Sequence, residues 1–221
     1  MSKSKNTTYA AVLAIAVIAV FAFWQLGGAD LFKPDTTAGT ILTINYTDGT
    51  KDILDSNGQK EGLAIKIPDT GKTMSSVKVE VYVAVKYTGT ISKYTVSGTF
   101  RMRINKVKDQ GEVEIYNSGK QTLQPLSPLP TLKSGDYPKV ISSATTTAGT
   151  IEGLYSGWQN DQIYIMYWEA PDPLSMTIIF TDGQTLTRTA TPQSVSLTFI
   201  YSAYTSSFSD LTVTFWKTVY Y

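Results

Sequence analysis

The stretch Asp69-Thr70-Gly71-Lys72-Thr73 is the first place where residue types suggest chemistry, because Gly-Lys-Thr ends a phosphate-binding P-loop. A P-loop also needs a glycine five residues before its second glycine, and Lys66 occupies that position. No helical pattern follows the stretch. We therefore interpret residues 69–73 as a turn between two strands.

Paired carboxylates are the second candidate, since two acids can divide general acid and general base roles. Glu112 and Glu114 are two residues apart, so they would share one face of a strand. Two other pairs qualify equally, Asp52 with Asp55 and Glu169 with Asp172. Acidic side chains usually lie in solvent, and we interpret all three pairs as surface residues.

The chain has no histidine and no cysteine, which removes the usual general base, thiolate nucleophiles, disulfides and the commonest metal ligands. The sequence also lacks a Gly-x-Ser-x-Gly elbow and a calcium-loop pattern. We predict no catalytic residue, no cofactor-binding residue and no metal site, and a protein that is not an enzyme. Net charge is +1, so we expect no nucleic-acid partner.

An apolar run, residues 9–26, is the segment expected to position the rest of the chain, and it extends from Tyr9 to Leu26. Lys5 is the last charge before it and Asp30 the first after it, and about 20 helical residues cross a bilayer core. A cleaved signal peptide is the competing interpretation, because Gly27-Gly28-Ala29 offers small residues at a cleavage position. The run is longer than a usual signal sequence, so we predict a retained transmembrane helix.

Charges on either side of this helix set its orientation. Lys3 and Lys5 precede it without a nearby acid, while two aspartates and Lys33 follow it. The positive-inside rule then places the N-terminus inside and the bulk of the chain outside. Asn45-Tyr46-Thr47 is consequently a glycosylation sequon on the outer side, and its occupancy is left open.

From residue 36 onward the apolar residues alternate with a period of two, which indicates strands. In residues 77–85 every second position is valine, and residues 95–104 repeat the alternation. Asp48-Gly49 and Asp182-Gly183 are hairpin turns. Further strands are expected at 40–47, 63–67, 112–116, 150–155, 162–168, 175–181, 185–189, 194–204 and 211–221. This spacing predicts an all-β fold of one or two antiparallel β-sandwiches, jelly-roll or immunoglobulin-like.

The proposed domain boundaries follow composition. Residues 1–35 are the membrane anchor and stem, 36–124 a β-sandwich, 125–133 a Pro-rich linker and 134–221 a second β-sandwich. The hexamer Thr-Thr-Ala-Gly-Thr-Ile occurs at 36–41 and again at 146–151, which a duplication would explain. The alternative is a single jelly-roll domain over 36–221.

Aromatic residues gather near the C-terminus, either as sandwich core or as a contact surface. The group comprises Tyr164, Met166, Tyr167, Trp168, Tyr201, Tyr204, Phe215 and Trp216. The final strand, 211–221, is expected to close its own sheet, with addition to a neighbour's sheet as the alternative.

In layout the chain resembles the vertex and minor capsid proteins of turreted, membrane-containing icosahedral viruses of hot-acid archaea. The features that carry this resemblance are the uncleaved helix, the Thr- and Tyr-rich strands and the lack of cysteine and histidine. The resemblance implies a jelly-roll-type fold, pentameric packing with other coat proteins and a non-enzymatic role in a virion above a lipid layer.

A cellular surface protein, such as an archaeal pilin, archaellum component or adhesin, is the alternative. Pilin precursors usually carry a basic residue and a small residue just before the helix. Here Lys5 is followed by Asn6, Thr7 and Thr8. A membrane-tethered hydrolase that uses only carboxylates is a third possibility.

Overall fold

A computed structural model describes residues 36–85, 87–123 and 140–217, and residues 36–221 form one compact unit. The predicted anchor, residues 9–26, and the Pro-rich linker, residues 125–133, lie outside the described residues. Within the described ranges, no helix has the length and apolar character needed to span a membrane.

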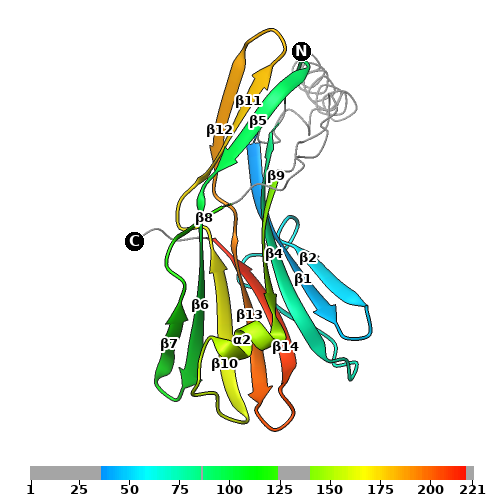
Figure 1. Ribbon diagram of the computed structural model, residues 1–221, viewed down its shortest axis with the longest axis vertical. Helices are drawn as coiled ribbons and strands as arrows, with labels where there is room; N and C mark the ends of the chain where they lie inside the picture. Colours follow the sequence, from blue (N-terminus) through cyan, green and yellow to red (C-terminus); the bar gives the residue numbers. More distant parts are fainter. Residues whose placement is uncertain (1–35, 86, 124–139, 218–221) are drawn as a thin grey trace, which may run out of the picture. The chain divides into compact units, whose positions relative to one another are not determined.

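Antiparallel β-sheets make up almost all of the described structure (Figure 1). Sheet A has the order β2 (Lys51–Asp55), β1 (Thr36–Tyr46), β4 (Met74–Val85) and β9 (Val140–Thr147). Sheet B has the order β3 (Ala64–Lys66), β14 (Ser207–Trp216), β13 (Ser194–Ser202), β10 (Gln162–Glu169), β6 (Thr99–Lys108) and β7 (Gly111–Asn117), and β8 (Gln121–Thr122) pairs with β6. Sheet C consists of β12 (Thr185–Ala190), β11 (Leu174–Phe180) and β5 (Ile91–Ser97). The all-β, antiparallel prediction is confirmed.

Period-two alternation explains why these segments are strands. Along β4, Val77, Val79, Val81, Val83 and Val85 are all at most 4% exposed, as their shared face requires. β10 and β13 place Tyr164, Leu197 and other apolar residues against them in the same hydrophobic cluster. Sheets A and B therefore share one core.

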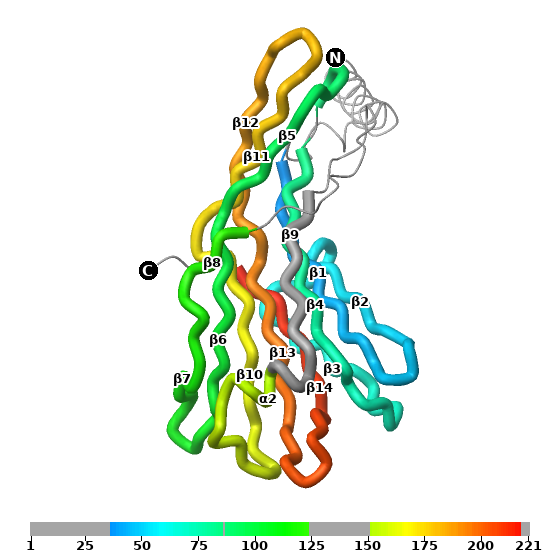
Figure 2. The backbone as a smooth tube through the Cα atoms, viewed as in Figure 1, coloured from blue at the N-terminus to red at the C-terminus, as the bar shows by residue number. Residues whose placement is uncertain are grey.

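Sheet C continues sheet B toward the end opposite the β13–β14 turn (Figure 2). β5 runs into β6 through Gly98, where an added Cβ would lie 2.5 Å from the Leu174 side chain. The inward residues Met176 and Ile178 of β11 are fully buried and belong to the common core.

The division into separate sandwiches at 36–124 and 134–221 does not describe the strand pairing. β10 pairs with β6, β14 pairs with β3, and β9 pairs with β4, so each of these contacts crosses the Pro-rich segment. Alternation identifies a strand and its buried face but not its partners. Strands from both sides of the Pro-rich segment therefore share sheets A and B.

A short helix, α2 (Ala148–Gly153), replaces most of the strand predicted at 150–155. Its residue Ile151 is fully buried, and a helix of six residues is too short to show a helical period in its sequence. The repeated hexamers also differ in structure, because the first lies within β1 and the second spans the end of β9 and the start of α2. Their conformations give the duplication no support.

Candidate functional site

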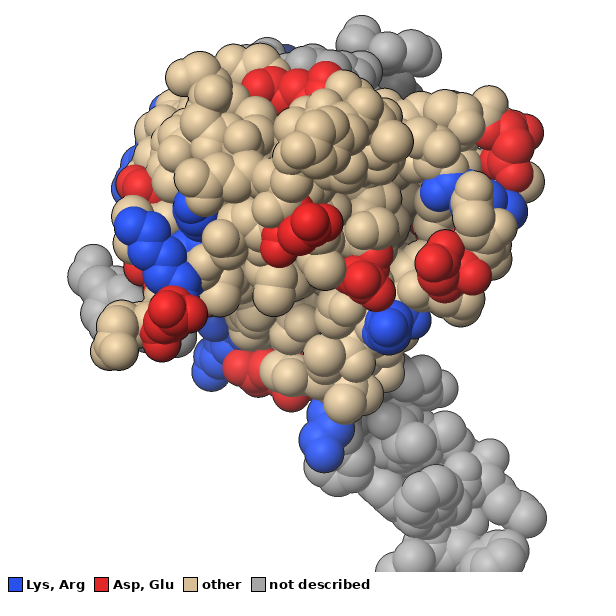
Figure 3. Space-filling model, turned by 90° about the horizontal axis from the view of Figure 1, so that it is seen from below, with Lys and Arg blue, Asp and Glu red and all other residues tan. Residues whose placement is uncertain are grey.

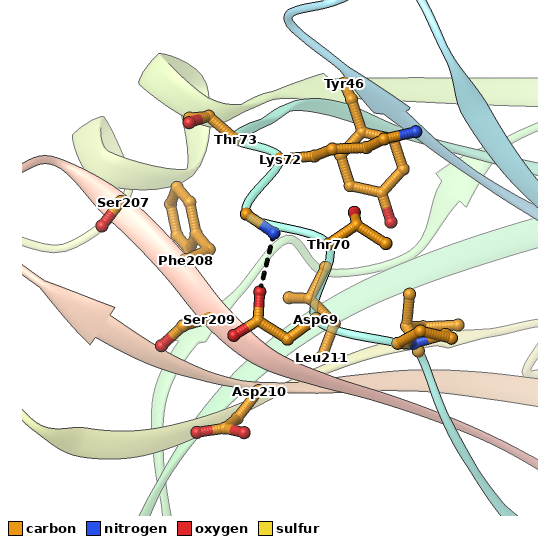
Figure 4. Close-up of a pocket in the computed structure, with 13 residues that line it drawn as sticks. Tyr46, Asp69, Thr70, Lys72, Thr73, Ser207, Phe208, Ser209, Asp210 and Leu211 are labelled. Atoms are coloured by element: carbon orange, nitrogen blue, oxygen red, sulfur yellow. Dashed lines mark hydrogen bonds between the residues drawn. The ribbon is translucent and has the colours of Figure 1, made fainter.

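A shallow pocket of about 210 Å³ lies between the β3–β4 loop and the start of β14 (Figure 4). Ile67, Phe208 and Leu211 form the buried part of its lining. The carboxylates of Asp69 and Asp210 and the hydroxyl groups of neighbouring residues surround this apolar part. The Gly-Lys-Thr segment forms one wall. It is a loop between two strands, in which the Gly71 N–H donates to Asp69 Oδ1 at 3.0 Å and Gly71 adopts a φ of +69°.

Lys72, the residue that a P-loop would direct at phosphate, is engaged elsewhere. Its Nζ donates to Thr50 Oγ1 at 2.7 Å, lies 3.6 Å from Asp48 Oδ2 and sits 5.5 Å from the centre of the Tyr46 ring. Figure 4 shows the side chain extended over that ring. The segment that follows the loop is the strand β4 and not a helix, so the loop lacks the helix N-terminus with which a P-loop holds phosphate.

Tyrosine hydroxyls, in contrast, contact several of the carboxylates nominated from sequence. Tyr46 Oη donates to Asp52 at 2.6 Å, and Tyr82 Oη donates to Asp55 at 2.9 Å. The pKa of both phenols is raised above the ordinary value of 10.0. Burial is the largest cause, and the hydrogen bonds to the carboxylates are the second. Asp52 and Asp55 therefore act as hydrogen-bond acceptors in sheet A.

Glu112 is held in the same way on sheet B. Its Oε2 accepts hydrogen bonds from Tyr167 Oη at 2.6 Å and from Asn105 Nδ2 at 2.8 Å. Glu114, its predicted partner, instead lies 3.4 Å from Arg103 Nη1 and accepts from Asn117. The two carboxylates are bound to different donors and do not form a pair. Their contacts instead hold strands of sheet B to one another.

Glu169 lies at the centre of an ionic cluster with Arg101 and Arg103. Its two oxygens lie 2.7 Å from Arg101 Nη2 and 2.6 Å from Arg103 Nη2, and its side chain is 13% exposed. Burial acts to raise the pKa of Glu169, but the hydrogen bonds from Arg103 and Arg101 outweigh it and hold the pKa below its usual range. Arg103 also stacks 5.0 Å from the centre of the Tyr167 ring. Asp172, paired with Glu169 in the sequence analysis, instead contacts Thr99 and Lys120.

Replacing Glu169 by Gln is expected to lower the free energy of unfolding by about 2 kcal/mol, because two half-buried guanidinium groups lose their counter-charge. Glu114→Gln is the matched control: its carboxylate is 43% exposed and its loss should change stability by about 0.5 kcal/mol or less. Urea unfolding of the full chain in a mild detergent measures both. Equal effects of the two substitutions would show that the Glu169 cluster contributes no more to the free energy of unfolding than the exposed Glu114 does.

Asn45, the outer-side sequon residue, lies within β1 and is half-buried. Its Nδ2, the atom that would carry a glycan, donates to Ser76 Oγ at 3.0 Å. A glycan on this half-buried nitrogen would crowd Ser76 and disturb this hydrogen bond. The structure therefore favours an unmodified Asn45.

The C-terminal aromatic group divides into three environments. Five members are core residues at most 5% exposed: Tyr164, Met166, Trp168, Tyr201 and Phe215. Tyr167 and Trp216 lie half-buried on the opposite face of sheet B, with ring centres 5.4 Å apart. Tyr204 is 89% exposed in the turn between β13 and β14. β14, the predicted final strand, pairs with β13 and β3 of its own sheet.

Positive and negative side chains alternate over the end of the unit that carries the β13–β14 turn (Figure 3). Lys and Arg do not gather into one patch in this view. The sequence analysis missed the Arg101–Glu169–Arg103 cluster, although the alternation Arg-Met-Arg in 101–103 already places both arginines on one strand face. No signal in the sequence identifies Glu169 as their partner.

Comparisons with family models, with curated proteins and with solved structures found no match to this chain.

Proposed function

We propose that this protein is a non-enzymatic, membrane-anchored structural component of a virion coat, packing beside other coat proteins above a lipid layer. The observation that carries the proposal is the uninterrupted apolar run at residues 9–26, bounded by Lys5 and Asp30 and followed by an antiparallel β-unit. The helix would root the chain with its N-terminus inside, and the β-unit would face outward.

The use of the carboxylates supports a structural role. Asp52, Asp55 and Glu112 accept hydrogen bonds from tyrosines, and Glu169 is held between two arginines. Such contacts join strands of one sheet, either neighbours or strands separated by one other, and rigidify the sheet. The finer fold that belongs to this proposal is a jelly-roll-type or immunoglobulin-like sandwich, and the assembly it implies is a homo-oligomer such as a pentamer.

Co-purification tests the proposal. The full-length chain should sediment with intact virus particles and remain with their lipid layer after the outer proteins are stripped. Recovery in the cell envelope without particles would instead support the alternative, an archaeal filament or envelope protein. Loss of the first few residues from the mature chain would favour the pilin version of that alternative.

The carboxylate-only hydrolase has its own test. Replacement of Glu112 and Glu114 by Gln should leave any hydrolytic activity of the purified protein unchanged. A hydrolytic activity that disappears with these substitutions would contradict the structural proposal.

A further inference from the structure

The face of sheet B that points away from the common core, here called the outer B face, has an unusual composition. Its central residues are Arg101, Arg103, Asn105 and Val107 of β6, Ile163, Ile165, Tyr167 and Glu169 of β10, Ser196, Thr198 and Ile200 of β13, and Thr212, Thr214 and Trp216 of β14. Glu112 and Glu114 of β7 lie along one edge, and Lys66 of β3 lies on the other.

Between Ile163 and Trp168, β10 carries apolar or aromatic residues on both of its faces. Its inward residues Tyr164, Met166 and Trp168 are at most 1% exposed, as core residues should be. Its outward residues are Ile163, which is 39% exposed, Ile165 and Tyr167, and then Glu169 at the end of the strand, whose charge is held by Arg101 and Arg103. A sheet with one face in water alternates apolar and polar residues, whereas a strand covered on both sides is apolar throughout. The sequence of β10 is therefore typical of a strand whose outward face is also covered.

One acid and one base on this face are placed so that a two-fold rotation would bring them together. One row crosses all six strands in register, and its residues are Glu114, Asn105, Ile165, Thr198, Thr212 and Lys66. The acid and the base at its two ends are five strand spacings apart, roughly 24 Å. The ion pairs that they make within the chain are long, 3.4 Å for Glu114 and 3.5 Å for Lys66.

We propose that the outer B face binds the outer B face of a second copy of this chain, with a two-fold axis parallel to the strands and midway between β10 and β13. This rotation places β7 of one copy opposite β3 of the other, so Glu114 meets Lys66 of the second copy. It also places β10 opposite β13, so that Ile163 meets Ile200 of the second copy. Each contact occurs twice, as an isologous interface requires.

The area of the face is adequate for such a dimer. Five strands of about seven residues each, with the three residues of β3, cover roughly 600 Å² per copy, or about 1,200 Å² in total, at the lower end of the range of stable interfaces. Arg, Tyr, Trp and Ile at its centre are residue types suited to an interface core. The inference deepens the proposed coat function, on which it rests for the choice of a second copy as partner.

Ile163→Arg tests the contact at its centre, using the full chain in a mild detergent and analytical ultracentrifugation. The side chain is 39% exposed, so the substitution should leave the fold intact. We expect the wild-type chain to dimerise and the variant to have a dissociation constant raised about tenfold or more. Ile53→Arg is the matched control, because Ile53 is 57% exposed on sheet A, and it should dimerise like the wild type. A monomeric wild type, or equal weakening by both substitutions, would overturn the proposal.

Cross-linking tests the geometry, and the absence of cysteine makes it specific. A mixture of Glu114→Cys chains and Lys66→Cys chains, treated with a short bis-maleimide, should give a covalent dimer. Glu114→Cys chains alone should not, because the two copies of this position would lie roughly 24 Å apart. Cross-linking of Glu114→Cys chains alone, or none in the mixture, would contradict the two-fold arrangement.

The membrane proposal is measured separately. If the chain floats with vesicles but the outer B face gives no dimer, the docking inference fails while the anchored structural role stands. If the chain dimerises through this face but does not float with vesicles, the docking inference stands and the anchored role fails.

Discussion

Replacing Gly39 by Ala is expected to destabilise the β-unit by about 3 kcal/mol, one of the largest effects of any single methyl group in this chain. An added Cβ at Gly39 would lie 2.4 Å from the ring and hydroxyl of Tyr82, which is 2% exposed. Tyr82 crosses over Gly39 to donate a hydrogen bond to Asp55, so it joins β4 to β2 across β1. A methyl group there must displace the ring and break that bond. Thermal or urea unfolding of the full chain in detergent measures the loss.

Two controls separate this contact from a general intolerance of side chains at glycine. Gly153→Ala, at the end of α2 where no atom lies within 4 Å of the added carbon, should change stability by less than about 0.5 kcal/mol. In a Tyr82→Leu background the further change Gly39→Ala should lose most of its effect, because the two residues are in contact. If Gly39→Ala is tolerated as well as Gly153→Ala, the ring does not occupy the position described.

Alkaline pH is expected to unfold the protein steeply. The pKa is raised above 10.0, chiefly by burial, for Tyr46, Tyr82, Tyr94, Tyr164, Tyr167 and Tyr201. These phenols release protons in the unfolded chain from about pH 10 but retain them when folded, so the folded state binds more protons and stability falls as pH rises. Tyr46 and Tyr82 alone would remove about 2.7 kcal/mol per pH unit above that point.

The pH dependence of urea unfolding measures this limb. Stability should be nearly constant up to about pH 9 and fall steeply above about pH 10. Tyr46→Phe combined with Tyr82→Phe should make the fall shallower, at the expense of two hydrogen bonds at neutral pH. An alkaline limb with the same slope in the double variant would contradict the assignment.

The acidic limb has the opposite sign. The pKa values of Asp48, Glu169 and Asp172 are held below their usual range, so the unfolded chain takes up protons first and stability falls below about pH 4. Asp48 and Asp172 are surface groups, which leaves Glu169 as the half-buried contributor among these three. Tyrosine donors remain protonated in acid, so they do not contribute to this fall.

The local sequence pattern was enough to predict much of this fold, but it was not enough to predict which strands pair with each other. The valines of 77–85 identify β4 and its buried face because a strand has a period of two. The same pattern does not reveal that β4 lies between β1 and β9, or that β6 lies beside β10. Those contacts depend on packing between segments far apart in the chain, so the boundary at 125–133 was placed between halves that share their sheets.

The candidate site shows the same limit. Alternation places Glu112 and Glu114 on one strand face, yet Glu112 is bound by Tyr167 and Asn105 while Glu114 turns to Arg103. Sequence spacing suggested a carboxylate pair, and cross-strand neighbours determined what each carboxylate does. Gly39 likewise gave no sequence signal, because its requirement comes from a ring on the neighbouring strand.

Vesicle flotation with intact-mass measurement tests the central claim most directly. A density gradient run on particles or membranes that contain the protein, after a high-salt wash, should place the chain with the lipid. Its mass should match a polypeptide that retains residues 9–26. A freely soluble chain that begins near Asp30 would contradict the anchored structural role.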